Sequence, residues 1–173
     1  MNWYTSTVTW FDDHLFRGLN LDYDQIQVLL ADEKIRLKGF ASTEDALRFF
    51  LLSENQANLI ICDHHLWWGS YPNPDTSSSD KLLYHWPTGD YFIKHLLTVR
   101  RDLSQVPLII HSDDQFAPSD WKNAGINFSA FIPKYRGYGS DKPSYFNLYQ
   151  KINELLNIPH GKEYESLPPW YRR

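Results

Sequence analysis

The stretch LIICDHHL, residues 59–66, decides the fold of this chain. Its first four residues are apolar without interruption, a pattern typical of a strand that is buried on both faces. Strands buried in this way belong to parallel sheets that carry helices on both sides. The apolar run ends at Asp63, so a carboxylate follows directly on a buried strand.

The segments around this stretch alternate between strand and helix patterns. Short apolar or alternating runs predict four further strands, at 8–11, 35–40, 107–110 and 131–132. Apolar residues at helical spacing predict helices near 26–30, 42–51, 88–100, 119–124 and 144–156. The order βαβαβαβαβα predicts a three-layer α/β/α fold around a five-stranded parallel sheet.

Four residues are expected to set helix ends. Ser42, with the acidic Asp45 three residues later, has the pattern of a capping box, and Thr88 is the predicted cap of the next helix. Gly125 is the predicted C-terminal cap of the helix at 119–124.

Composition excludes several classes of protein. The formal net charge is −4 and no basic stripe interrupts it, so we expect no nucleic-acid partner. No apolar stretch approaches the length of a membrane span, and residues 1–9 lack the pattern of a signal peptide. Cys62 is the only cysteine, which excludes an internal disulfide. A cytoplasmic protein without a membrane partner fits these features.

The chain divides into a predicted domain at 1–157, with an insert at 67–87, and a tail at 158–173. The insert is rich in Ser, Pro and Asp and is far longer than the usual connection from a strand to a helix. Its aromatic residues either form a partner surface, cover the site as a lid, or are disordered; they are Trp67, Trp68, Tyr71, Tyr84 and Trp86.

Polar side chains follow four of the predicted strands. They are Asp12, Asp13, Asp63, Ser112 and Lys134. Right-handed crossovers bring the carboxyl ends of parallel strands to one edge of the sheet, so these residues are expected to gather there. Clustered carboxylates repel one another, and a divalent cation removes that repulsion. Because the ligands that these carboxylates offer are all oxygen atoms, the predicted cation is Mg²⁺.

With these residues the chain resembles the receiver domain of bacterial two-component response regulators. The matching pieces are VTWFDD (8–13), LIICDHHL (59–66), TGDYFIKHLLTVRR (88–101), VPLIIHS (106–112), NAG (123–125) and FIPK (131–134). The separation of Ser112 and Lys134, 134 − 112 = 22 residues, also agrees with the family. The resemblance implies the flavodoxin-like, CheY-like doubly wound fold.

The resemblance also implies a role for each site residue. Asp63 matches the phosphate acceptor, and Asp12, Asp13, Asp63 and the backbone carbonyl of His65 match the Mg²⁺ ligands. Ser112 matches the switch hydroxyl, and Lys134 matches the lysine that pairs with the phosphoryl group. Phe131 matches the aromatic switch residue.

The implied function is that of a stand-alone signalling protein rather than an enzyme. A histidine kinase or a phosphotransfer protein would supply the phosphoryl group. Since no output domain follows residue 157, the signal is expected to pass to a separate downstream protein.

Some positions depart from the family and keep other hypotheses open. Trp67 and Tyr135 stand where prolines are usual, and Asp113 stands where a small residue is usual, with the further carboxylate of Asp114 beside it. One alternative is a receiver-like interaction module that works without phosphorylation. Another is a Mg²⁺-dependent phosphohydrolase with Asp63 as nucleophile.

A zinc site is a weaker alternative. It would use His64 and His65, with His14 or His111 nearby. The spacing matches no zinc motif, and one histidine of an adjacent pair is expected to point away from the other.

Overall fold

Five parallel strands form the centre of the molecule. The computed structural model describes residues 4–15, 21–52, 56–66, 88–134, 142–159 and 161–169. The strands are β1 (Ser6–Phe11), β2 (Ile35–Phe40), β3 (Leu59–Cys62), β4 (Leu108–Ser112) and β5 (Ala130–Pro133). They pair in the order β2-β1-β3-β4-β5. This order confirms the flavodoxin-like doubly wound fold, with its switch point between β1 and β3.

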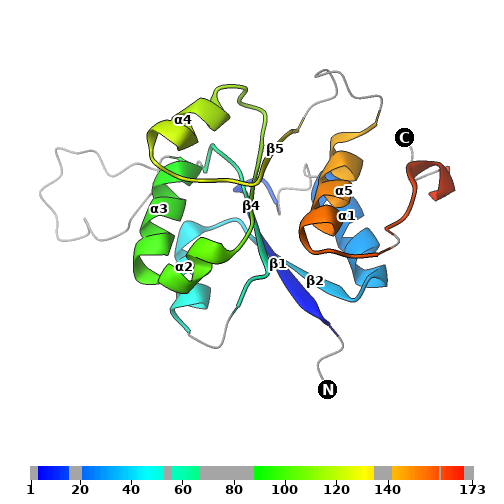
Figure 1. The fold of residues 1–173 in the computed structure, drawn as a ribbon, viewed down its shortest axis with the longest axis horizontal. Coiled ribbons are helices and arrows are strands. Elements are labelled where there is room, and N and C mark those ends of the chain that lie inside the picture. The colour runs from blue at the N-terminus through cyan, green and yellow to red at the C-terminus, as the bar shows by residue number, and fades with distance from the viewer. Residues whose placement is uncertain are drawn as a thin grey trace, which may run out of the picture.

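Helices cover both faces of the sheet. They are α1 (Leu21–Asp32), α2 (Thr43–Leu51), α3 (Gly89–Val99), α4 (Ala117–Asn123) and α5 (Ser144–Leu155). Two 3₁₀ helices, η1 (Arg101–Gln105) and η2 (Tyr164–Ser166), were not predicted. Helices α1 and α5 lie on one face, and α2, α3 and α4 lie on the other (Figure 1). The predicted α/β/α layering is therefore confirmed.

The core consists of two apolar clusters, one on each face of the sheet. Leu59 and Ile61 of β3 join the cluster under α1 and α5, whereas Ile60 and Cys62 join the cluster under α2, α3 and α4. All four side chains are at most 2% exposed. The unbroken apolar run therefore has the cause inferred from the sequence, because β3 is central and both of its faces are covered.

The helix ends agree only in part with the predicted caps. The hydroxyl of Ser42 accepts a hydrogen bond from the backbone N–H of Asp45 at 3.3 Å, as a capping residue should. Gly125 ends α4 with φ +77°, the left-handed conformation expected of a C-terminal cap. Thr88 stands at the N-cap of α3 but makes no capping hydrogen bond with its side chain. The predicted N-cap position of Thr88 is therefore confirmed, although its hydroxyl takes no part in the cap.

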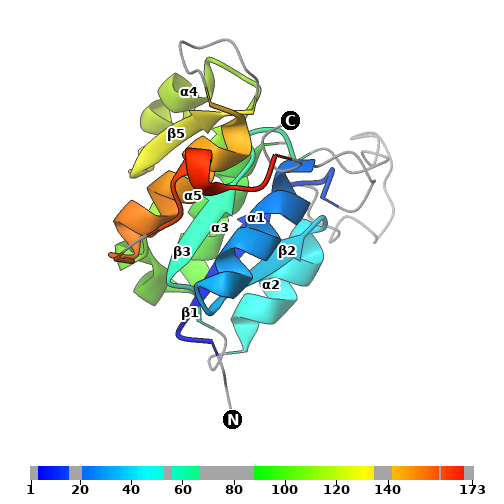
Figure 2. The same ribbon diagram turned by 90° about the vertical axis from the view of Figure 1, so that its right-hand side faces the viewer.

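The described part of the tail packs back on the face formed by α1 and α5 (Figure 2). Leu167 is 3% exposed and belongs to the apolar cluster there. The backbone N–H of Lys162 donates to the hydroxyl of Tyr149 at 3.0 Å, and the Lys162 ammonium pairs with Asp32. The division at residue 157 stays a prediction.

Among the described residues, no helix has both the length and the apolar character needed to cross a membrane. The cytoplasmic location stays a prediction.

Candidate functional site

The carboxylates of Asp12 and Asp63 meet because they follow neighbouring parallel strands. Phe11 of β1 is in register with Cys62 of β3, so the next residue of each strand is placed side by side. The backbone N–H of Asp12 donates to the Phe40 carbonyl at 3.1 Å, and that of Asp63 donates to the Phe11 carbonyl at 2.9 Å. Both aspartates thus continue the hydrogen-bond ladder and are fixed at the sheet edge.

Lys134 joins these two carboxylates. Its Nζ lies 2.8 Å from Oδ2 of Asp12 and also donates to Oδ2 of Asp63. Its backbone N–H donates to the Ser112 carbonyl at 3.0 Å, which holds the end of β5 against β4. Burial alone lowers the pKa of the Lys134 ammonium, but the charges of Asp63 and Asp12 raise it well above its usual value. Lys134 is therefore a fixed positive charge at the centre of the cluster.

Asp13 is the third carboxylate, and it lies beside His14. Nδ1 of His14 is 3.2 Å from Oδ1 of Asp13, and the His14 backbone N–H donates to Oδ1 of Asp12 at 2.9 Å. The side chain of Asp13 is only 3% exposed. Burial raises the pKa of Asp13, His14 opposes this, and the charges of Asp12 and Asp63 raise it further. The environment therefore disfavours a negative charge on Asp13.

The acidic cluster fits the predicted Mg²⁺. Three almost fully buried carboxylates lie here, and the ammonium of Lys134 pairs with two of them, Asp12 and Asp63, so among the described residues the carboxylates outnumber it. Nδ1 of His14 lies 3.2 Å from Oδ1 of Asp13, but this buried oxygen accepts no well-aligned hydrogen bond among the described residues. A cation that prefers oxygen ligands would satisfy this atom and remove the excess charge. Asp12, Asp13 and Asp63 are the residues that would hold it.

Ser112 is the last residue of β4 and is fully buried. Its hydroxyl accepts a hydrogen bond from the backbone N–H of Asp114 at 3.2 Å, so it is engaged with its own loop. The sequence placed Ser112 after the strand; the structure places Ser112 within it, together with His111.

Phe131 lies on β5 next to Ile110, two residues before the register pair of Ser112 and Pro133. Its side chain is half-buried and packs against the cluster under α2, α3 and α4.

Solved structures of response regulators share this architecture. One is a two-component response regulator from Clostridium difficile (TM-score 0.56, 14% identity), which covers 88% of this chain and 97% of its own. Another is the chemotaxis protein CheY4 of Vibrio cholerae (TM-score 0.56, 12% identity, 87% of this chain and 98% of that one). A third is a receiver protein from Pseudoalteromonas atlantica (TM-score 0.55, 18% identity, 87% and 97%).

The chain has the fold of a response-regulator receiver domain. The resemblance seen in the sequence is thereby confirmed at the level of the fold. No protein-family model matches the sequence, and no curated protein matches it either. The identities to the solved structures are low, so the roles of the individual residues are not carried over with the fold.

A connection between the two loops beside Asp63 of this receiver fold was not predicted. Asp114, in the loop after β4, accepts from the backbone N–H of Phe116 at 2.8 Å and lies 3.1 Å from Nε2 of His65. These contacts, led by the Phe116 N–H, lower the pKa of the Asp114 carboxyl. Asp114 thus ties the loop after β4 to the loop after β3, whereas Asp113 is exposed.

The histidine pair in this receiver fold does not behave as predicted. Both rings face Asp114: Nε2 of His64 is 3.9 Å and Nε2 of His65 is 3.1 Å from the same carboxylate oxygen. The expectation that one ring points away is wrong, because the chain turns after Asp63 and brings the two rings within 4.8 Å. The three residues lie close enough together to surround a metal ion.

The hydrogen bonding of His64 nevertheless argues against zinc. The buried indole N–H of Trp121 donates to Nδ1 of His64 at 2.9 Å. A neutral His64 therefore carries its proton on Nε2, the nitrogen that faces the carboxylates. A nitrogen that bears a proton cannot bind a metal, so His64 is a hydrogen-bond donor in this arrangement. The hydrogen bond from Trp121 could not be predicted, since nothing in the sequence connects Trp121 to His64.

The other two histidines of the zinc alternative, His14 and His111, have different partners. His14 lies beside the acidic pair. His111 is buried on the face of the sheet that α1 covers, and its Nδ1 lies 2.8 Å from the Ile132 carbonyl. The insert at 67–87 with its five aromatic residues, and Tyr135, lie outside the described residues.

Gly89 explains why α3 can begin so close to the site. A Cβ at this position would lie 2.0 Å from the backbone carbonyl oxygen of Asp63 and 2.9 Å from Cζ2 of Trp121. The Gly89 N–H also donates to the His64 carbonyl at 2.7 Å. Only glycine allows this close approach, and it fixes the loop that carries Asp63.

Proposed function

We propose that this protein is a receiver that accepts a phosphoryl group on Asp63 and signals through contacts with other proteins. The arrangement of Lys134 between Asp63 and Asp12, with the buried carboxylate of Asp13 next in the chain to Asp12, carries this proposal. It supplies a carboxylate nucleophile, a fixed positive charge and oxygen ligands for a cation at one sheet edge. Receiver domains are signalling modules rather than enzymes in the usual sense, which fits the fold.

The proposed reaction forms a bond between an Asp63 carboxylate oxygen and phosphorus. The bond from phosphorus to the donor breaks, and its electron pair leaves with the donor, a phosphohistidine imidazole in a histidine kinase or phosphotransfer protein. The product is an acyl phosphate on Asp63. Positioning and charge compensation are the main requirements of such a transfer.

The neighbouring residues have separate parts in this proposal. A bound Mg²⁺ would compensate the charge of the incoming phosphoryl group, held by Asp12, Asp13, Asp63 and the His65 carbonyl. Lys134 would exchange its contact with Asp63 for a phosphoryl oxygen. The hydroxyl of Ser112 would leave the Asp114 N–H and turn toward the phosphoryl group, and Phe131 would move with it.

The test uses the unmodified chain, a small phosphodonor such as acetyl phosphate, and Mg²⁺, with intact mass as the measurement. We expect an adduct of about 80 Da, the mass of one phosphoryl group. The adduct should be absent from Asp63→Asn and present in Asp113→Asn, a matched control whose exposed carboxylate lies close to the site. No adduct in the wild type, or an equal adduct in Asp63→Asn, would refute the proposal.

The same experiment separates the alternatives. Continued release of phosphate by multiple turnover of a phosphate ester would favour the phosphohydrolase. Absence of an adduct together with retained partner binding would favour the interaction module that works without phosphorylation.

A further inference from the structure

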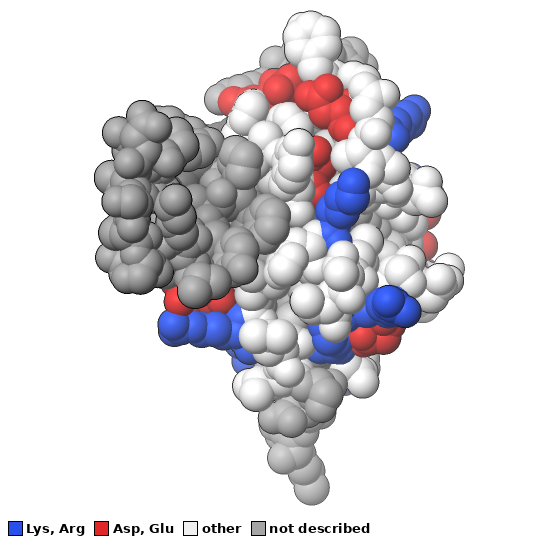
Figure 3. All heavy atoms as spheres, turned by 90° about the vertical axis from the view of Figure 1, so that its left-hand side faces the viewer, with Lys and Arg blue, Asp and Glu red and all other residues white. Residues whose placement is uncertain are grey.

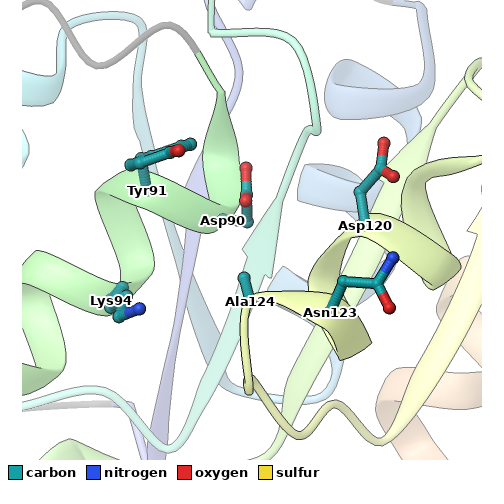
Figure 4. A pocket seen from close by; sticks show the side chains of 6 residues that line it. All are labelled: Asp90, Tyr91, Lys94, Asp120, Asn123 and Ala124. Atoms are coloured by element: carbon teal, nitrogen blue, oxygen red, sulfur yellow. The ribbon is translucent and has the colours of Figure 1, made fainter.

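A groove of about 380 Å³ lies between α3 and α4, on the face of the sheet away from α1 and α5. Figure 4 shows it between the two helices, with side chains from α3 on one wall and from α4 on the other. It is lined by Asp90, Tyr91, Lys94, Asp120, Asn123 and Ala124. Most of the lining side chains are polar or charged, and none of them belongs to the acidic cluster at Asp63.

Asp90 is the residue of this groove that indicates a ligand. Its side chain stands in the space between the two helices (Figure 4), and the residue is only 6% exposed. Oδ1 of Asp90 is buried and makes no hydrogen bond with any described residue. A carboxylate oxygen that is buried without a donor is unfavourable, and native proteins rarely leave such an atom unsatisfied. A donor that enters the groove would satisfy it.

A second carboxylate lies on the opposite wall. Asp120 of α4 is about half exposed, and its Oδ2 is 3.5 Å from Nε2 of the buried His64. Lys94 of α3 contributes the single positive charge of the lining. No ion pair within 4 Å joins Lys94 to Asp90 or Asp120 in the described structure. With two carboxylates and one ammonium, the groove keeps a net negative charge.

The rim of the groove adds a contact surface. Tyr91, next to Asp90, is 57% exposed, and Asn123 offers an amide from the α4 side. An exposed tyrosine ring attracts cations through its face and is a residue type common at the centres of protein interfaces. Figure 3 shows this side of the molecule, where acidic atoms gather toward one end of the face.

We propose that this groove binds an arginine side chain presented by a partner protein. A guanidinium carries five donors in one plane, so it can bridge Asp90 and Asp120 from between the walls, which the single ammonium of lysine does less well. Sites for free small molecules are mostly apolar and enclose their ligand. The side chains that line this groove are mostly polar or charged, and two of them are carboxylates, which suits a charged side chain presented by a protein.

The inference does not depend on phosphorylation of Asp63, and its test uses the unphosphorylated full chain. The probe is the blocked tripeptide acetyl-Gly-Arg-Gly-amide, titrated while backbone amide NMR signals are recorded. We expect saturable shifts confined to α3 and α4. The same peptide with citrulline, which keeps the shape of arginine without its charge, should bind roughly tenfold more weakly or worse.

Variants assign the binding to the groove. Asp90→Asn should weaken the arginine peptide on the order of tenfold, and Asp120→Asn should weaken it less because that carboxylate is half exposed. Asp24→Asn is the matched control: it removes an exposed carboxylate of α1, on the opposite face, and should leave the affinity unchanged. Circular dichroism checks that each variant is folded.

Three results would overturn the inference. One is the absence of saturable binding by the arginine peptide, and another is equal affinity for the citrulline peptide. The third is an unchanged affinity in Asp90→Asn. Tighter binding of free arginine than of the blocked peptide would show a small-molecule site and would overturn the assignment to a protein partner.

Discussion

Replacement of Lys134 by methionine tests the central ion pairs of the site. Methionine keeps an unbranched stem of four heavy atoms and removes the charged nitrogen at its end. The variant leaves the carboxylates of Asp12, Asp13 and Asp63 in a buried cluster without their ammonium. The neighbouring carboxylates then repel one another in surroundings that water hardly reaches.

The expected loss is large because the groups are buried. The side chain of Lys134 is 18% exposed, and that of Asp12 is 0% exposed. Breaking a buried pair by removing one partner costs about 3–5 kcal/mol of the free energy of unfolding. For a chain of this size, that corresponds to a decrease in Tm of roughly 6–20 °C.

Lys162→Met is the matched control. Lys162 also pairs with an aspartate, Asp32, but these side chains are 39% and 56% exposed. Pairs in such surroundings contribute about 1 kcal/mol or less, because water and salt screen them. The two variants therefore remove the same charge from the same residue type, and the pairs that they break differ in burial and in the number of carboxylates, two for Lys134 and one for Lys162.

The assay is urea unfolding at pH 7 without divalent ions, followed by tryptophan fluorescence. The raised pKa of Lys134 means that its ammonium is fully charged below about 10.5, its ordinary value, and that its contribution to stability is lost as the pH rises through the raised value. The loss in Lys134→Met should shrink at acid pH, where Asp13, whose pKa is raised by burial, takes up a proton and the repulsion within the cluster falls. Added Mg²⁺ should stabilise this variant more than the wild type. A loss no larger than that of Lys162→Met, or one independent of pH, would refute the reasoning.

Two further predictions concern Asp13 and the glycines. The raised pKa of Asp13 means that its contribution to stability is present below about 3.8 and is lost as the pH rises through the raised value. Asp13→Asn should therefore unfold at a higher urea concentration than the wild type at pH 7 and at a similar concentration near pH 4. A lower urea midpoint of the variant at pH 7 without Mg²⁺ would contradict this prediction. Gly89→Ala should lower the free energy of unfolding by about 3 kcal/mol or more, because the added Cβ meets the Asp63 carbonyl. Gly125→Ala should lower it by about 1 kcal/mol, because Gly125 has φ +77° but open space around it. Equal urea midpoints of the two variants would contradict this prediction.

The sequence by itself determined the order of the elements and the place where the site would form. The apolar run 59–62 could be interpreted because a central parallel strand needs apolar residues on both faces, and this requirement is local. The strand ends were then enough to place Asp12, Asp63 and Lys134 at one edge, since parallel strands joined by crossovers all end at the same edge of the sheet. The role of Gly125 as a helix cap could also be predicted, because the left-handed conformation of such a cap favours glycine.

Only the tertiary structure decided which side chains contact each other within this frame. The bond from Trp121 to His64, which sets the proton on His64, joins residues 57 positions apart. Asp114 and His65, which also lie close together, are 49 positions apart, and Oδ1 of Asp90 is buried without a hydrogen-bond partner among the described residues. Periodicity and strand ends fix the backbone of each element. The direction of a polar side chain depends on neighbours brought together by the whole chain, which no local pattern records.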